Sequence, residues 1–384
     1  MIRKILCLLM SLSALFSMLL TVCASSDTKN SARSAAVYCV DNKEFLYCKN
    51  AELQLPMAST TKIMTAILAL EANMPSLSIT ISPTMLEGSE GSSMGLKSGD
   101  IITLEGLIYG LLLSSGNDAA NVVANVLAGS ISDFCAMMNS KAKELSMSST
   151  NFVNPSGLPD KNHYSTAHDM ALLTAYALSN PLFVEICSCV SKPVYFGNPP
   201  YLQTLYNHNK LLQLYEGAIG VKTGFTKASG RCLVSAARKQ AITLIAVTLN
   251  DPDDWNDHRR LLDFGFSLVR SITPRVELPK EIPVAGAFEG EAARLEAAIS
   301  PIVVGNGSDA KYRTELLLKK VLFAPVSSGR QAGLVRIFNE SGDLLSEAPI
   351  YVKNSIEAYD SVNQMSCFDR IKNKIIKFFT KMSG

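Results

Sequence analysis

Two short apolar runs, residues 35–40 and 45–48, lie on either side of the polar triplet Asp41-Asn42-Lys43. This arrangement is typical of a β-hairpin. Further along, the apolar positions change to helical spacing, at Ile63, Met64, Ile67, Leu68 and Leu70. We therefore expect a buried helix after the hairpin, with Ser59 in its first turn.

The next part of the chain alternates a polar loop with helical patterns. Residues 82–100 are rich in Gly, Ser and Pro and predict a loop. Apolar spacing then predicts helices at 104–113, 119–127 and 166–178. These segments indicate a mainly helical insert between the first strands and Lys222.

From Ala218 the pattern returns to extended segments. Residues 218–221 predict a strand that leads into Lys222, and 231–237 with 241–249 predict a second hairpin. A helical pattern at 261–269 closes the region. Because strands lie near both ends with helices between them, we expect an α/β domain at 33–270 whose sheet joins its two ends.

A second domain follows a boundary at 271–279, which contains two prolines. Beyond it, short apolar segments such as 316–322 and 334–338 alternate with turns at Pro325, Gly329 and Gly342. This alternation predicts a small β-rich domain at 276–355.

The first residues of the chain have the pattern of a secretory signal. Arg3 and Lys4 precede an apolar run from Ile5 to Leu20, and Val22-Cys23-Ala24 is a small-residue cleavage pattern. We expect residues 1–24 to be a signal peptide and the protein to be exported. A retained transmembrane anchor is the alternative.

The last residues predict an amphipathic helix at 366–383. Its apolar face includes Phe378 and Phe379, and lysines occupy much of the remainder. Such a helix is suited to a membrane interface, where apolar burial and anionic lipids hold it. We expect it to place the protein on the outer face of the cytoplasmic membrane. Packing on the β-rich domain and a solvated tail are the alternatives.

Composition excludes some classes of function. The 384 residues carry a formal net charge of +2 with 18% charged residues, so the overall balance predicts no nucleic-acid partner. The four histidines, at 163, 168, 208 and 258, show no H-x-x-x-H pattern, and no C-x-x-C pair is present, so we expect no metal and no cofactor. A Cys39–Cys48 bridge across the first hairpin is possible, but buried thiols are favoured.

Three short motifs carry the candidate chemistry: Ser59-Thr60-Thr61-Lys62, Ser115-Gly116-Asn117 and Lys222-Thr223-Gly224. Ser and Lys three residues apart on a helix share one face, about 5–6 Å apart at Cβ. A lysine amine so placed can take the proton of a serine hydroxyl without any histidine. S-x-x-K is an acylation motif, and K-T-G accompanies it in the same enzymes.

Each motif suggests a role. Lys62 can be the base for Ser59 if burial, the helix terminus and a second ammonium lower its pKa, and Lys222 is the candidate for that ammonium. Ser115 could relay a proton to the leaving amine, and Asn117 offers an amide to a substrate carbonyl. Lys222 and Thr223 on an edge strand could hold a carboxylate. Gly224 would let the substrate backbone approach the strand.

These motifs resemble those of the D-alanyl-D-alanine carboxypeptidases, which are low-molecular-mass serine penicillin-binding proteins. The matching stretches are 56–65, 91–96, 111–120, 163–169 and 220–226. The resemblance covers 33–270 and continues more weakly through 324–329 and the amphipathic tail. It implies a penicillin-binding/β-lactamase-like α/β domain, with an antiparallel sheet flanked by helices and a helical insert. A small β-rich domain and a C-terminal amphipathic helix would follow.

The resemblance also implies a reaction on peptidoglycan stem peptides. Ser59 would attack the carbonyl between two D-alanines with Lys62 as base, and water would then release the acyl-enzyme. The backbone N–H groups of Ser59 and Phe225 would form the oxyanion hole. β-Lactam antibiotics would acylate Ser59. The pair Arg259-Arg260 offers no clear choice for a further carboxylate contact.

Other functions share parts of this pattern. A class A β-lactamase needs a glutamate for deacylation, and Glu144, Glu185 and Glu216 lie in no E-x-x-L-N setting. A peptidoglycan transpeptidase shares the acylation step and differs in its acceptor. Gly91-Ser92-Ser93-Met94-Gly95 matches G-x-S-x-G, but it lies in a polar loop, where the strand and helix of an α/β-hydrolase elbow are not expected. A non-catalytic cell-wall binding module would not need all three motifs intact.

Overall fold

The computed structural model describes residues 28–306, 311–359 and 372, and the chain divides into two compact units between Arg270 and Ser271. The signal peptide predicted at 1–24 lies outside the described residues, and so does the tail predicted at 366–383 apart from Lys372. In the part that is described, no single helix has the length and apolar composition to cross a membrane. Two pairs of consecutive helices, α4–α5 and α6–α7 (bounds below), reach that length and composition when the helices of a pair are taken together. The chain bends by 85° between α4 and α5 and by 109° between α6 and α7.

The first unit is built on a five-stranded antiparallel sheet in the order β2-β1-β9-β8-β7. Its strands are β1 Ser34–Cys39, β2 Glu44–Lys49, β7 Ala218–Thr226, β8 Gly230–Lys239 and β9 Ile242–Leu249. Every residue of β1 and β9 is buried, because both faces of these inner strands are covered. Pairing of β1 with β9 confirms that the sheet joins the two ends of the unit, and both predicted hairpins are present.

The register of the first hairpin separates its two cysteines. Cys39 pairs with Glu44, whereas Cys48 pairs with Ala36. Burial raises the pKa of the Cys39 thiol to about 12. Cys39 therefore acts as a small apolar side chain inside the sheet.

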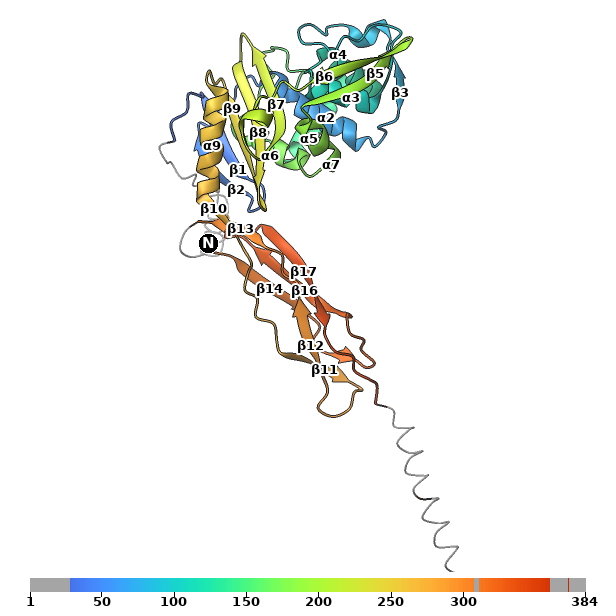
Figure 1. Ribbon diagram of the computed structural model, residues 1–384, viewed down its shortest axis with the longest axis vertical. Helices are drawn as coiled ribbons and strands as arrows, with labels where there is room; N and C mark the ends of the chain where they lie inside the picture. Colours follow the sequence, from blue (N-terminus) through green and yellow to red (C-terminus); the bar gives the residue numbers. More distant parts are fainter. Residues whose placement is uncertain (1–27, 307–310, 360–371, 373–384) are drawn as a thin grey trace, which may run out of the picture. The chain divides into compact units, whose positions relative to one another are not determined.

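Helices cover both faces of this sheet (Figure 1). The long helix α9 packs on one face, against β9, β8 and β1, and α6 packs on the other, with the remaining helices beyond it. The helices are η1 Ala58–Thr61, α2 Lys62–Glu71, η2 Pro83–Leu86, α3 Leu104–Leu112, α4 Asn117–Ala128, α5 Ile131–Glu144, α6 Ala167–Ala177, α7 Pro181–Ser188, α8 Leu211–Leu214 and α9 Asp254–Leu268.

Some of these helices differ from the prediction. Ser59 lies in the short 3₁₀ turn η1 rather than in the first turn of an α-helix, and α2 begins at Lys62. Helix α9 begins at Asp254, before the predicted start at 261, because the acidic residues Asp254 and Asp257 suit a helix N-terminus without adding apolar periodicity. Helix α7 was not predicted, although Asn180 caps it and Pro181 is its first residue.

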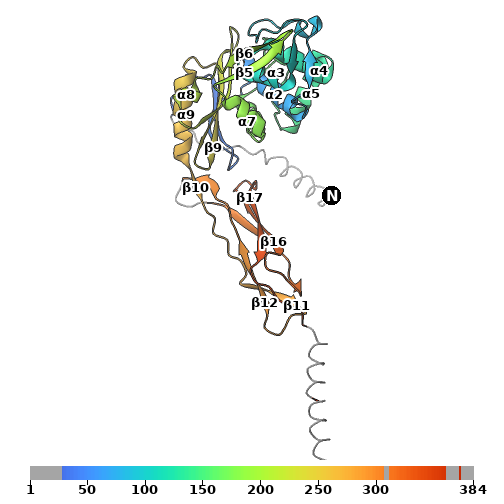
Figure 2. The ribbon, with the colours of Figure 1, turned by 45° about the vertical axis from the view of Figure 1, so that its right-hand side comes forward.

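The insert also contains a small sheet that the apolar pattern did not reveal. It has the order β3-β4-β5-β6, with β3 Ser78–Thr80, β4 Ile101–Thr103, β5 Ser191–Gly197 and β6 Pro200–Tyr206. The β5–β6 hairpin is largely exposed and carries prolines, so it has no regular buried face to identify it. The prediction of a mainly helical insert is therefore incomplete (Figure 2).

The second unit confirms the prediction of a β-rich C-terminal domain. A six-stranded sheet has the order β14-β16-β17-β12-β11-β15. Its strands are β11 Glu281–Ala285, β12 Ala292–Ala297, β14 Arg313–Leu318, β15 Leu322–Phe323, β16 Gln331–Phe338 and β17 Leu344–Val352. Two short strands, β10 Val269–Ile272 and β13 Ile302–Gly305, form a separate two-stranded sheet. The segment predicted at 316–322 is in fact the end of β14 and the start of β15.

Candidate active site

Ser59 and Lys62 lie together at the start of α2, as their spacing predicts. Lys62 Nζ is 3.1 Å from Ser59 Oγ. The Lys62 side chain is completely buried, whereas Ser59 lines a cavity of about 350 Å³. The pair therefore has its base inside the protein and its hydroxyl at the surface that a substrate can reach.

The surroundings of Lys62 favour a neutral amine. Burial lowers the pKa of Lys62 well below its ordinary value, and the charge of Lys222 lowers it further. Nζ donates to Asn117 Oδ1 at 2.6 Å and to the Ser156 carbonyl at 2.7 Å. Both of these partners can only accept, so they use the two hydrogens of a neutral amine. The lone pair is then left toward Ser59 Oγ.

The second motif connects α3 to α4. Ser115 has a positive φ of 59°, is buried and lines the cavity. Asn117 begins α4, and its amide is held at both ends, by Lys62 Nζ and by the Glu90 carbonyl. The structure thus gives Asn117 a role in orienting Lys62. Its predicted contact with a substrate carbonyl stays a prediction.

Asp118, next to this motif, fixes the loop that borders the cavity. Its carboxylate accepts from the backbone N–H groups of Met94, Gly95 and Leu96 and from Ser93 Oγ. This loop carries Ser92, which lines the cavity. The Gly91–Gly95 segment has no regular strand or helix, so the G-x-S-x-G match is not a nucleophile elbow.

The third motif lies on β7, which is the edge strand that the sequence predicts. Burial lowers the pKa of Lys222 to about 7, and its Nζ donates to the Thr223 carbonyl at 2.9 Å. Thr223, Gly224 and Phe225 line the cavity, with the Phe225 side chain 65% exposed. Thr223, Gly224 and Phe225 therefore form a wall of the cavity next to Ser59, whereas the Lys222 side chain is buried behind it.

Two glycines allow backbone segments to approach Ser59 closely. A Cβ on Gly224 would lie 3.0 Å from Ser59 N and 3.1 Å from Met57 O. A Cβ on Gly157, whose φ is +89°, would lie 1.9 Å from Ala58 O. Gly224 thus lets β7 pack against η1, which is a reason for this glycine that the sequence did not suggest.

Several residues of the site could not be read from motifs. Ser156 contributes a backbone carbonyl, which no side-chain pattern encodes. His163 fixes its loop to η1, since Nδ1 accepts from Val153 N and Nε2 lies 2.8 Å from Thr61 Oγ1. Burial lowers the pKa of His163 to about 4, so the imidazole is neutral and its part is structural.

The far side of the cavity is formed by residues outside the three motifs. They come from the loop before α8, from β8 and from α9: His208, Lys210, Arg231, Asp254 and Trp255. Burial, followed by the charge of Lys222, lowers the pKa of His208. Arg231 and Trp255 were not predicted, because a lone arginine or tryptophan carries no positional signal in a sequence.

Within the described residues, one group could approach a metal ligand set: Glu52, His168 and Asp169. Asp169 already accepts from Ser149 N and Thr150 Oγ1, and its other oxygen lies 3.3 Å from His168 Nδ1. His168 also stacks on Phe45, with ring centroids 4.4 Å apart. These contacts account for the group without an ion.

Comparison with known proteins agrees with this geometry. The family described as D-alanyl-D-alanine carboxypeptidase matches residues 21–253. The chain is 30% identical over 345 residues to the D-alanyl-D-alanine carboxypeptidase DacF of Bacillus subtilis, over 87% of this chain and 88% of that protein. It is 35% identical over 237 residues to DacB2 of Mycobacterium tuberculosis, over 60% of this chain and 80% of that protein.

Solved structures give the same picture. The Streptomyces K15 DD-transpeptidase matches with a TM-score of 0.60 and 29% identity, over 62% of this chain and 98% of that one. Penicillin binding protein 5 from Haemophilus influenzae, at 24% identity, shares the fold with a TM-score of 0.64, over 87% of this chain and 100% of that one.

Proposed function

This chain belongs to the D-alanyl-D-alanine carboxypeptidase family, and from that premise we propose that the substrate acylates Ser59 when the enzyme removes the terminal D-alanine of a peptidoglycan stem peptide. The activity is that of a serine hydrolase. The single observation that carries the assignment of Ser59 is the position of Lys62 Nζ, buried and 3.1 Å from Ser59 Oγ.

In the first step Ser59 Oγ attacks the carbonyl carbon between the two D-alanines. Lys62 Nζ takes the hydroxyl proton, while Asn117 Oδ1 and the Ser156 carbonyl keep its lone pair directed at Ser59. The new C–O bond places negative charge on the carbonyl oxygen. The backbone N–H groups of Ser59 and Phe225 stabilise that charge, an interaction that can change the rate by about a hundredfold or more.

The tetrahedral intermediate then loses its C–N bond. Ser115, which lines the cavity, passes the proton from Lys62 to the leaving nitrogen, and D-alanine departs. Lys222 and Thr223 hold its carboxylate by charge and by hydroxyl donation. A water molecule, deprotonated by Lys62, afterwards attacks the ester carbonyl. The C–O bond to Ser59 breaks, and Lys62 returns the proton to Ser59 Oγ.

β-Lactams enter the same pathway. Their strained amide takes the place of the D-Ala-D-Ala bond, and Ser59 opens it to an ester. Because the leaving nitrogen stays tethered to the acyl group and hinders the approach of water, the ester bond to Ser59 is hydrolysed slowly. We therefore expect penicillins to inhibit the enzyme as trapped acyl-enzymes.

A penicillin adduct tests the assignment of Ser59. After incubation with benzylpenicillin, the peptide that contains Ser59 should gain the mass of one penicillin, and the Ser115→Ala variant should still acquire it at Ser59, only more slowly. An adduct on Ser115, on Ser92 or on no residue of the folded protein would contradict the assignment.

A transpeptidase is the second candidate, favoured by the likeness to the K15 DD-transpeptidase. It would use the same acyl-enzyme and transfer the acyl group to an amine instead of water. Adding a free amino acceptor to the D-alanine release reaction separates the two. Hydrolysed product should dominate for a carboxypeptidase, and amide product for a transpeptidase. A wall-binding module without activity would give neither.

We also propose that the protein acts outside the cytoplasm, on the outer face of the cytoplasmic membrane. The support is in the sequence: the signal pattern at 1–24 and the apolar and lysine-rich faces of the tail at 366–383.

A further inference from the structure

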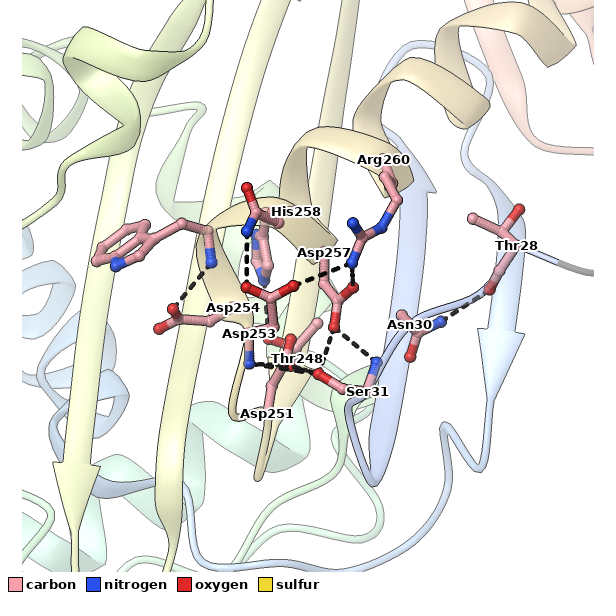
Figure 3. Close-up of polar contacts among 12 residues, drawn as sticks. Thr28, Asn30, Ser31, Thr248, Asp251, Asp253, Asp254, Asp257, His258 and Arg260 are labelled. Atoms are coloured by element: carbon pink, nitrogen blue, oxygen red, sulfur yellow. Dashed lines mark hydrogen bonds and ion pairs between the residues drawn. The ribbon is translucent and has the colours of Figure 1, made fainter.

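Ser31, just before β1, lies against the start of α9 although it belongs to no motif. Its Oγ is 2.7 Å from Asp251 Oδ1 and 2.7 Å from Asp257 Oδ2. Figure 3 shows Ser31 beside these two carboxyl groups, one from the loop between β9 and α9 (residues 250–253) and one from α9. A serine hydroxyl has a single hydrogen to donate. It serves one carboxylate, so the other carboxyl needs a proton of its own for its contact to be attractive.

Asp257 has the contacts of an ionised carboxylate. Its Oδ2 also accepts from Ser31 N at 2.6 Å, and its Oδ1 forms an ion pair with Arg260. Although burial opposes ionisation, the hydrogen bonds from Ser31 and Arg260 lower the pKa of Asp257. Asp257 is therefore the carboxylate that takes the Ser31 hydroxyl hydrogen.

Asp251 has the contacts of a neutral carboxyl. Its side chain is completely buried, and Oδ2 has no hydrogen-bond partner among the described residues. An ionised carboxylate in that position would lack both water and donors, which is costly. Burial raises the pKa of Asp251 to about 6, with a further contribution from Asp257 and an opposing one from the Ser31 hydroxyl. The protonated Asp251 donates to Ser31 Oγ, and Ser31 donates in turn to Asp257.

Other charged or titratable groups surround this pair. They are Lys29 and Arg33 on the N-terminal segment, Arg231 and Cys232 on β8, Asp253 in the loop, and Asp254, His258 and Arg260 on α9. Burial lowers the pKa of His258 to about 3 and raises that of Cys232 to about 11, so both stay neutral near pH 6. Asp254 is ion-paired with Arg231, whose charge is permanent.

The loop that carries Asp251 also leads to the catalytic cavity. Asp251 N donates to the Arg231 carbonyl at 2.9 Å. Asp254 Oδ1 accepts from Arg231 Nη2 and from Trp255 N, both at 2.8 Å. Arg231, Asp254 and Trp255 line the cavity together with Ser59. A change at Asp251 is therefore one short loop away from the cavity wall.

We propose that Ser31, Asp251 and Asp257 form a proton-operated latch. A proton on Asp251 fixes Ser31 against the start of α9. When that proton leaves for water, two buried carboxylates face one hydroxyl, and water reaches them by displacing Ser31, which is the exposed member of the three. The displacement loosens the cavity wall at Asp254 and Trp255.

The opening is local, because the neighbours of Ser31 have contacts of their own. Asn30 Nδ2 donates to the Tyr47 hydroxyl at 2.7 Å, and Arg33 N donates to the Asn250 carbonyl at 3.0 Å. Neither contact involves a group that titrates near pH 6. The latch is independent of the acyl transfer proposed for Ser59, so either proposal can fail without the other.

Hydrogen exchange at the Ser31 amide tests the latch, because this N–H donates to Asp257. Between pH 5 and pH 7.5 its protection in the full chain, corrected for the intrinsic effect of pH, should fall about 30-fold, since pH 7.5 is about 1.5 units above the Asp251 pKa. The Val40 amide, bonded to the Thr243 carbonyl at the far end of β1, is the internal control and should not change.

Asp251→Asn should lock the latch, because its carboxamide N–H can donate to Ser31 Oγ at any pH. Protection of the Ser31 amide should then stay at the pH 5 value. Asp253→Asn is the matched control: it makes the same exchange in the same loop at a side chain that is 49% exposed, and it should keep the wild-type fall. No fall in the wild type, or an equal fall in Asp251→Asn, would overturn the proposal.

If Asp251→Asn does not fold, Ser31→Ala decides. Without the hydroxyl, Asp251 loses the hydrogen bond that favours its ionised form, so its pKa should rise further. The fall in protection at residue 31 should then disappear between pH 5 and pH 7.5. A fall that persists in Ser31→Ala would overturn the latch.

The fluorescence of Trp255, the only tryptophan of the chain, tests whether the latch reaches the cavity. It should show a step with the same midpoint as the exchange at Ser31, and Asp251→Asn should lack that step. His208 also lines the cavity, so His208→Gln is the control and should keep the step. A step that His208→Gln removes and Asp251→Asn keeps would contradict the coupling to the cavity.

Discussion

Lys62 and Lys222 are both buried, and the consequences of that burial differ because their partners differ. Lys62 Nζ faces Ser59 Oγ and two carbonyl-type acceptors, so losing its proton produces a base. Lys222 Nζ donates to the Thr223 carbonyl instead, and its charge helps to lower the pKa of Lys62. The proposed reaction therefore needs a neutral Lys62 and a charged Lys222.

This division of roles predicts a bell-shaped dependence of kcat/KM on pH. The acid limb reports Lys62, whose pKa is lowered, because protonation removes the base. The alkaline limb reports Lys222, which loses its charge above a pKa of about 7. In Lys222→Arg the charge persists, so the fall between pH 7 and pH 9, about tenfold for a charged hydrogen bond, should disappear.

Steady-state kinetics across pH 5 to pH 9 would measure both limbs. The acid limb of Lys222→Arg should remain, which serves as the internal control. An alkaline limb of unchanged midpoint in Lys222→Arg would show that Lys222 does not cause it.

At the scale of elements, the site depends on how closely β7 approaches η1. Gly224 makes this approach possible, because a Cβ there would meet the backbone at Ser59 N and Met57 O. Backbone atoms cannot move aside as the end of a flexible side chain can. Gly224→Ala should therefore separate Ser59 from Phe225 by a few tenths of an ångström and lower kcat by about 10- to 100-fold.

The measurement is D-alanine release by Gly224→Ala, with circular dichroism to show that the fold is kept. Gly305→Ala in β13 is the control, since a Cβ there has nothing within 4 Å and its φ is not positive. Wild-type kcat in Gly224→Ala would contradict the role given to this close approach.

The elements also show what a sequence can reveal. The hairpin strands β1, β2, β8 and β9 have regular apolar runs between polar turns, and Ser59 and Lys62 share a helical face, so both were predicted. The β5–β6 hairpin has an exposed face and no such pattern. Ser156 contributes a backbone carbonyl, and Arg231 is held at the cavity by its ion pair with Asp254. Neither contact can be inferred from residue type or from spacing in the sequence, so both had to be identified from the structure.

At the scale of the whole molecule, the proposed membrane location depends on residues 366–383. Deleting them should abolish cosedimentation with vesicles that contain anionic phospholipid, because both the apolar face and the lysines are lost. D-Alanine release from a small peptide should stay within about twofold, since the deleted residues lie outside the α/β unit.

A matched variant separates the two forces in the tail. Phe379→Ser should weaken binding to neutral and anionic vesicles alike, whereas added salt should weaken only the binding to anionic ones. Vesicle binding by the deletion variant equal to that of the full chain would contradict the membrane proposal.

The proposed function requires that Ser59, with Lys62 as its base, breaks the D-Ala-D-Ala bond. The most direct measurement is D-alanine release from a peptide ending in D-Ala-D-Ala, by the full chain and by Ser59→Ala. We expect release by the wild type and a loss of about a thousandfold or more in a folded Ser59→Ala protein, since the nucleophile is gone. Undiminished release by Ser59→Ala, or no release by the folded wild type, would contradict it.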